Sequence, residues 1–98
     1  MTLTQLRYFA AVARSKSLSR AADELHIAQP AITRQLKLLE TELEAVLFTR
    51  HHRGVELTDA GRALLGDARA IMAQVEHAFA STRRTARGEQ AGVQQGQP

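Results

Sequence analysis

The sequence predicts a mainly α-helical fold in which three short helices and a two-stranded hairpin precede one long helix. Apolar residues recur at helical spacing on both sides of a short turn at 26–28, which indicates two helices packed across that turn. Two apolar runs flank the polar residues RHHRG at 50–54, as in a hairpin. After Leu57 the helical apolar period continues to about Arg87, which predicts the long helix.

The first helix is predicted to begin between Thr2 and Thr4, because Thr2 and Gln5 have the spacing of a capping box. Its buried stripe is expected to consist of Leu6, Phe9, Ala10, Val12 and Ala13. Ser17 or its neighbour is a candidate N-cap for the second helix.

The second and third helices are predicted at 18–25 and from Gln29 to about Glu44. Pro30 fits the first turn of a helix, where a missing N–H has no cost. The third helix should bury Ile32, Leu36 and Leu39. It should expose a polar and cationic face made of Gln29, Ala31, Thr33, Arg34 and Lys37. Such a face suits a helix in the major groove of DNA, with the acidic far end at 40–44 pointing away from it.

The hairpin is predicted within 46–57, with the polar residues at its tip. Next to a recognition helix, such a hairpin is a wing. Arg50, His52 and Arg53 are placed there to reach phosphates or a narrow minor groove. We predict no metal site, because the neighbouring residues His51 and His52 point to opposite faces of a strand.

The long helix is predicted at 59–87, with Thr58 as its N-cap. Its start, with Leu57, Ala60 and Leu64, is expected to cover the chain's own core. The helix also carries an apolar band with a coiled-coil period, which predicts pairing with a second copy. The candidate dimerisation residues are Leu64, Leu65, Ala68, Ile71, Met72, Val75 and Phe79. The polar tail at 88–98 is expected to be disordered.

The composition limits the class of protein. The chain has 98 residues, enough for one small domain with an appendage, and only 4% are aromatic, which argues against a sheet that stacks single-stranded bases. Its net charge of +3 agrees with a polyanionic partner. The sequence contains no cysteine, no secretory signal and no apolar run of membrane-spanning length, so we expect a cytoplasmic protein with no membrane contact.

Several motifs occur in a fixed order along the chain: Ala21-Ala22, Gln29-Pro30-Ala31, Leu39-Glu40, Leu47-Phe48 with Arg50, and Leu57-Thr58-x-Ala60-Gly61. Together they resemble the N-terminal DNA-binding region of LysR-type transcriptional regulators, over residues 3–86. The resemblance implies a winged helix–turn–helix headpiece at 1–58 and a linker helix at 59–87 that pairs two chains antiparallel. Such a homodimer, part of a tetramer in the full-length regulator, would bind an interrupted palindrome.

The resemblance also implies which residues bind double-stranded operator DNA. Gln29, Pro30, Ala31, Thr33 and Arg34 would face bases and phosphates, and Arg50, His52 and Arg53 would form the wing contacts. No cofactor is expected. A small-molecule inducer would bind only the effector domain that follows in this family, before which this chain ends. The wing sequence HHRGVELT resembles that of regulators of aromatic-compound catabolism.

One residue departs from the family pattern. Ala28 stands where the family usually carries serine or threonine, so the third helix lacks that N-cap. Its free amide groups would then be satisfied by Gln29 or by a DNA phosphate.

Two other functional classes are weaker. An interaction module that uses only the long helix would bind a partner without the steep salt dependence of phosphate contacts. An enzyme has no support, because the carboxylates are spread over exposed helix positions and no serine or histidine pair has the spacing of a nucleophile and its base.

Overall fold

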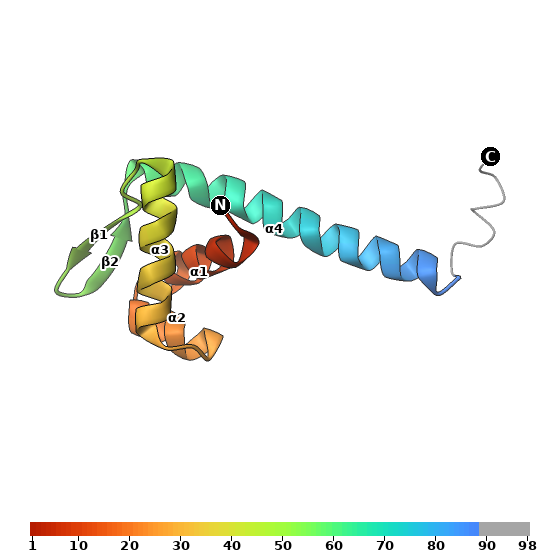
Figure 1. Ribbon diagram of the computed structural model, residues 1–98, viewed down its shortest axis with the longest axis horizontal. Helices are drawn as coiled ribbons and strands as arrows, with labels where there is room; N and C mark the ends of the chain where they lie inside the picture. The colour runs from red at the N-terminus through yellow and green to blue at the C-terminus, as the bar shows by residue number, and fades with distance from the viewer. Residues whose placement is uncertain (89–98) are drawn as a thin grey trace.

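The computed structural model of the chain describes residues 1–88 as four helices and one hairpin (Figure 1). The elements are α1 (Leu3–Ser15), α2 (Leu18–Leu25), α3 (Gln29–Leu43), β1 (Phe48–His51), β2 (Gly54–Leu57) and α4 (Asp59–Ala86). The predicted fold class is confirmed: a winged helix–turn–helix followed by a long helix. The predicted disorder at 88–98 falls, apart from Gly88, outside the described residues.

The first two helices begin at the predicted caps. The Thr2 side chain accepts a hydrogen bond from the Gln5 amide, and the Gln5 side chain accepts one from the Thr2 amide, which completes a capping box. Ser17 caps α2 by accepting from the Arg20 amide. Both helices end at a residue in the left-handed region, Lys16 and His26, so the chain turns sharply after each of them.

The core lies where α1, α2 and α3 meet. Its most deeply buried large side chains are Phe9, Val12, Ile32, Leu39 and Leu47. Ala21 of α2 is also fully buried in this core. The stripe on α1 differs in one respect, because Ala11 is buried whereas Ala10 and Ala13 are only half-buried.

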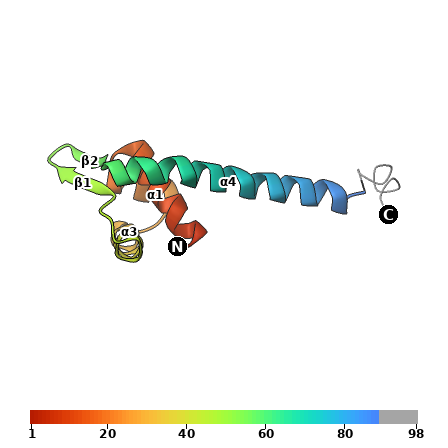
Figure 2. The ribbon, with the colours of Figure 1, turned by 90° about the horizontal axis from the view of Figure 1, so that it is seen from above.

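The wing is a two-stranded antiparallel hairpin in which Phe48 pairs with Leu57 and His51 with Gly54. It is shorter than the predicted apolar runs, because β1 begins at Phe48. Leu47 is buried in the core and Val46 is 62% exposed, so these two residues form a loop before the strand. Figure 2 shows the hairpin at one end of the molecule and the free part of α4 at the other.

Helix α4 begins at the predicted N-cap, where the Thr58 hydroxyl accepts from the Gly61 amide. The first half of α4 packs against α1, and its second half extends away from the other elements (Figure 1). The part that covers the core is longer than predicted. Leu64, Leu65 and Met72 pack against the core, and Ala68 is fully buried in it. By contrast, Ala60, which was expected to cover the core, is exposed.

The burial of Ala68 therefore removes this residue from the predicted dimerisation surface. Its side chain has no exposed area within a single chain, so it is not available to a partner. The apolar period alone could not separate residues that face a partner from residues that face the chain's own headpiece, because both lie at helical spacing.

Candidate nucleic-acid interface

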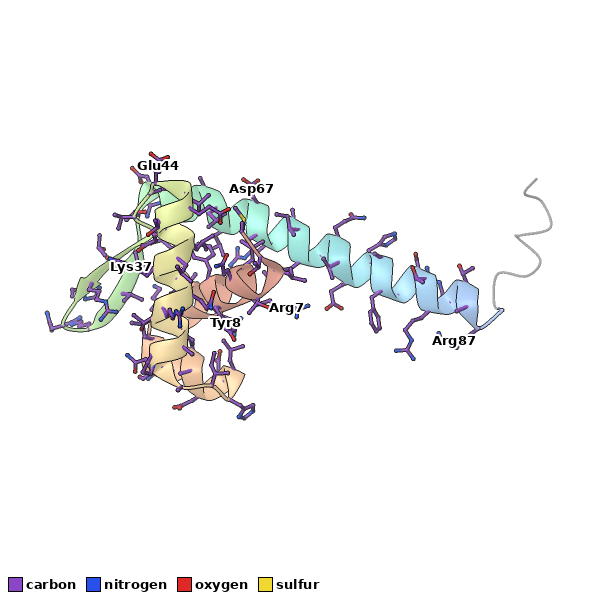
Figure 3. The ribbon with its side chains drawn as sticks, in the orientation of Figure 1. Arg7, Tyr8, Lys37, Glu44, Asp67 and Arg87 are labelled. Atoms are coloured by element: carbon purple, nitrogen blue, oxygen red, sulfur yellow. The ribbon has the colours of Figure 1, made fainter. Side chains whose placement is uncertain are left out.

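Helix α3 has one buried face and one polar face. The buried face packs into the core with Ile32, Leu36 and Leu39. The opposite side of the helix is therefore exposed to solvent. All five predicted residues of that side are exposed: Gln29, Ala31, Thr33, Arg34 and Lys37. Figure 3 shows Lys37 on the side of α3 that faces the hairpin.

An open groove of about 810 Å³ runs along this side of α3 toward the hairpin. Its lining contains six of the nine predicted DNA-binding residues, namely Gln29, Pro30, Thr33, Arg34, Lys37 and Arg50. The structure thus brings Arg50 of β1 beside α3, although it is separated from that helix in sequence. Ala31 lies on the exposed side of α3 without lining the groove.

The remaining two predicted residues, His52 and Arg53, form the exposed turn of the hairpin. His52 lines a second groove of about 230 Å³, together with Ser17 and Ser19 at the start of α2, Gln29 and Arg50. The hairpin turn is held by His51, whose Nδ1 accepts a hydrogen bond from the Arg53 amide at 3.2 Å. His51 also lies 3.8 Å from Glu56 on the opposite strand.

The hairpin is fixed to the rest of the headpiece on its α1 side. The Val55 amide donates to the Lys16 carbonyl at 3.2 Å, and the Phe48 ring lies 5.3 Å from that of Phe9. Gly54 has φ +135°, and a Cβ there would lie 2.3 Å from the Lys16 carbonyl oxygen. Glycine is therefore needed at this position both for its backbone conformation and for the close approach to α1.

The cations of this surface have no carboxylate partner in the described part of the chain. Arg34, Lys37, Arg50 and Arg53 form no ion pair within residues 1–88. Two arginines elsewhere are paired: Arg14 with Glu24 at 2.6 Å, and Arg62 with Asp59. Unpaired cations on one exposed surface favour a polyanionic ligand there.

The start of α3 lacks a side-chain cap, as the sequence predicted. Ala28 is the N-cap residue and forms no capping hydrogen bond, and the first turn contains Pro30. The Ala31 amide donates to the Ala28 carbonyl at 3.0 Å and Pro30 has no N–H, so the Gln29 amide is the one left for solvent or for a bound anion in this turn of the described chain.

Three features of this surface were not predicted from the sequence. Leu38 lines the larger groove and is 48% exposed, although a leucine in this helix would be expected in the core. Ser17 and Ser19 line the smaller groove, for which the only sequence signal was the capping role of Ser17. Glu40, which was predicted to point away from DNA with the acidic end of α3, is half-buried and accepts a hydrogen bond from the Leu47 amide at 2.7 Å.

The histidines do not assemble a metal site in the part of the chain that the structure covers. Within residues 1–88, no group of three or more histidine, aspartate or glutamate side chains is arranged to hold a metal ion. In the same range, no helix has both the length and the apolar character required to cross a membrane.

A second exposed surface lies on the outer half of α4. Ile71 and Phe79 are 42% and 63% exposed, and Val75 between them is half-buried. The Arg83 guanidinium lies over the Phe79 ring at 5.4 Å. This apolar surface, Ile71–Val75–Phe79, has no covering element within the described residues.

Comparison with known proteins finds the same architecture. The model of a protein family described as "Bacterial regulatory helix-turn-helix protein, lysR family" matches residues 3–62. The chain is 51% identical over 89 residues to the "HTH-type transcriptional regulator ClcR" of Pseudomonas putida, covering 91% of this chain and 30% of ClcR. It is 47% identical, with the same coverage, to the regulator TcbR of Pseudomonas sp. strain P51. The chain thus spans about a third of the length of these curated relatives.

Two solved structures with bound DNA are also similar. The "CbnR_DBD-DNA complex" superposes with a TM-score of 0.83 at 46% identity, covering 88% of this chain and 99% of that one. The "BenM_DBD/catB site 1 DNA Complex" superposes with a TM-score of 0.87 at 39% identity, covering 91% and 96%.

Proposed function

The chain belongs to the LysR family of bacterial regulatory helix–turn–helix proteins, and we propose that it is the sequence-specific DNA-binding part of a transcriptional regulator. The observation that supports this most directly is the exposed, unpaired cationic surface shared by α3 and the wing. The similarity to regulators and to DNA-bound domains supports the same proposal.

In this proposal α3 enters the major groove with its N-terminal half. Gln29 pairs with an adenine edge, and the Thr33 methyl group contacts a thymine methyl. Arg34 binds either a guanine or a phosphate. Pro30, Ala31 and Lys37 complete the surface on α3, and the Gln29 amide at its start faces a phosphate. Figure 3 shows Glu44 at the end of α3 that lies away from α2, and in this proposal that acidic end points away from the duplex.

The wing contributes contacts outside the major groove. Arg50, His52 and Arg53 approach phosphates or the adjacent minor groove, where a narrow width attracts arginine. These contacts carry little sequence information, so the wing adds affinity and fixes the orientation of α3.

Two copies bind one interrupted palindrome through pairing of the long helices. Ile71, Val75 and Phe79 supply the exposed apolar area for this pairing. Leu64, Leu65 and Met72 keep partly exposed edges that extend the same interface. A tetramer and an inducer-binding domain belong to the full-length regulator. The protein acts in the cytoplasm, where its DNA lies, and has no catalytic role.

Salt dependence tests the proposal. Binding of a fluorescent duplex should weaken steeply with salt, because each phosphate contact contributes about 0.9 to the slope of log K against log salt concentration. Binding that is absent, or that does not change with salt, would reject DNA binding. Self-association that persists without DNA binding would instead favour an interaction module based on α4.

A further inference from the structure

The loop between α3 and the wing is tied to the helices on both of its sides. On the α3 side, the Glu40 carboxylate accepts a hydrogen bond from the Leu47 amide at 2.7 Å. On the α4 side, the Thr58 hydroxyl donates to the Val46 carbonyl at 2.6 Å, and the Thr58 amide donates to the Leu47 carbonyl at 3.0 Å. These residues, Glu40, Val46, Leu47 and Thr58, are called the junction below.

The amide of Leu47 has a strict need for an acceptor. Leu47 is 1% exposed, and a buried N–H without a partner destabilises the conformation that buries it. The residue lies before β1, so its backbone groups do not take part in the β1–β2 ladder. Glu40 therefore supplies from α3 the acceptor that a longer hairpin would have supplied from its second strand.

The position of Glu40 is electrostatically unfavourable for DNA binding by itself. It lines a groove of about 310 Å³ between α3 and the wing, together with Lys37 and Arg50. A carboxylate among cations that meet phosphates weakens their attraction for the polyanion. Its hydrogen bond to Leu47 gives a reason for a carboxylate at this place.

The junction also packs closely against the start of α4. A Cβ on Gly61 would lie 2.3 Å from the Leu47 carbonyl oxygen, so this oxygen rests directly against the first turn of α4. Thr58 both caps α4 and holds the loop. Contacts with both α3 and α4 therefore fix the position of the loop from which the wing begins.

We propose that Glu40 is a positioning residue for DNA binding: through Leu47 it sets the place of the wing relative to α3 and so decides how much Arg53 contributes. This inference rests on the proposed DNA binding. It predicts that Glu40 and Arg53 are coupled energetically although no contact joins their side chains. Arg34 lies on α3, which the core holds independently through Ile32 and Leu39, and should not be coupled to Glu40.

A double-mutant cycle on duplex binding tests the coupling. In the wild-type background, Arg53→Ala should lower the salt slope by about 0.9, the value of one phosphate contact. In the Glu40→Ala background, Arg53→Ala should lower the salt slope by less than about 0.45, half the value of one phosphate contact. Arg34→Ala should have equal effects on affinity in both backgrounds. Because removing a negative charge raises affinity generally, the comparison uses the effect of Arg53→Ala within each background.

Conservative variants separate positioning from simple loss of the fold. Glu40→Gln keeps an oxygen acceptor and should restore the full effect of Arg53→Ala. If Glu40→Ala fails to fold, Thr58→Asp provides the second test, because aspartate can cap α4 but cannot donate to the Val46 carbonyl. The effect of Arg53→Ala should shrink in that background too, with Thr58→Ser as the control that keeps the donor.

The outcomes distinguish this inference from the proposed function. A wild-type chain that binds no duplex rejects the proposed function itself. A wild-type chain that binds, with an effect of Arg53→Ala that is the same in the wild-type, Glu40→Ala and Thr58→Asp backgrounds, overturns the positioning role. A smaller effect of Arg34→Ala in Glu40→Ala would also overturn it, since it would indicate a general disturbance of α3.

Discussion

Arg34 belongs to α3 and Arg53 to the turn of the hairpin, and neither forms an ion pair within residues 1–88. Arg34→Ala and Arg53→Ala should therefore weaken DNA binding while helicity is unchanged. If Arg34 reads a guanine, its loss should cost about 1–3 kcal/mol and relax specificity at one position. If it binds a phosphate, the salt slope should instead fall by about 0.9. Fluorescence anisotropy over a range of salt concentrations measures both.

The control for these variants is Arg69→Ala. Arg69 is an exposed residue of α4, outside the surface formed by α3 and the wing, so its loss should leave both affinity and slope nearly unchanged. Unchanged binding in both Arg34→Ala and Arg53→Ala would contradict the docking proposed for α3 and the wing.

Two glycines of α4 should respond oppositely to the same substitution. Gly61→Ala should destabilise the fold by roughly 1–3 kcal/mol, because its Cβ would lie 2.3 Å from the Leu47 carbonyl oxygen. A Cβ on Gly66 would meet nothing within 4 Å beyond the nearby backbone of its own helix, so Gly66→Ala should stabilise by about 0.5–1 kcal/mol through helix propensity. Urea denaturation followed by circular dichroism tests both, and equal effects would contradict the close packing of Leu47 on α4.

At the scale of single residues, sequence patterns predicted which side chains are exposed better than they predicted long-range hydrogen-bond partners. The five exposed residues of α3 and the caps Thr2, Ser17 and Thr58 were predicted correctly, because each depends on local spacing. The role of Glu40 was missed, because its partner Leu47 is a backbone amide seven residues away whose burial follows from tertiary packing. The burial of Ala68 was missed for the same reason.

At the scale of elements, α3 begins without a side-chain cap, so adding one should raise the stability of the fold. Ala28→Ser should stabilise the free protein by about 1 kcal/mol, because a serine hydroxyl would accept from the Ala31 amide, which now donates only to the Ala28 carbonyl at 3.0 Å. Ala70→Ser is the matched control, since Ala70 is exposed in the middle of α4 and serine there should be slightly destabilising. Thermal unfolding that shows no gain for Ala28→Ser would indicate that the hydrogen bond to the Ala28 carbonyl already satisfies the Ala31 amide.

The wing shows where the prediction of elements fails. The apolar run Val46-Leu47-Phe48 was predicted to enter the first strand, but β1 begins at Phe48. Local alternation could not reveal this, because the backbone groups of Leu47 are taken by Glu40 and Thr58 rather than by β2. The four helices were predicted closely, since their bounds depend on caps, periodicity and Pro30.

At the scale of the whole molecule, α4 has two apolar faces. Leu64, Leu65, Ala68 and Met72 face the headpiece, whereas Ile71, Val75 and Phe79 have no covering element among residues 1–88. The sequence predicted the long helix and a start of it that covers the core, but it also assigned Ala68, which is fully buried, to a partner. Only the packing of α1 against α4 shows which residues remain for a second copy.

Replacing both Ile71 and Val75 by glutamate should therefore dissociate the dimer, because paired helices would bury four carboxylates. Sedimentation measures the loss of dimer, and affinity for a palindromic duplex should fall far more than affinity for a random duplex. Ala73→Glu, at an exposed position of α4 outside Ile71–Val75–Phe79, is the control and should leave the dimer intact. Equal losses of affinity on both duplexes would contradict pairing through α4.

The most direct test of DNA reading by a paired molecule is the selection of bound duplexes from a random-sequence pool by the purified chain. Enrichment of an interrupted palindrome with a fixed spacing is the predicted result, because α3 reads each half-site and α4 sets their separation. No enrichment over the starting pool would contradict sequence-specific DNA binding by this surface.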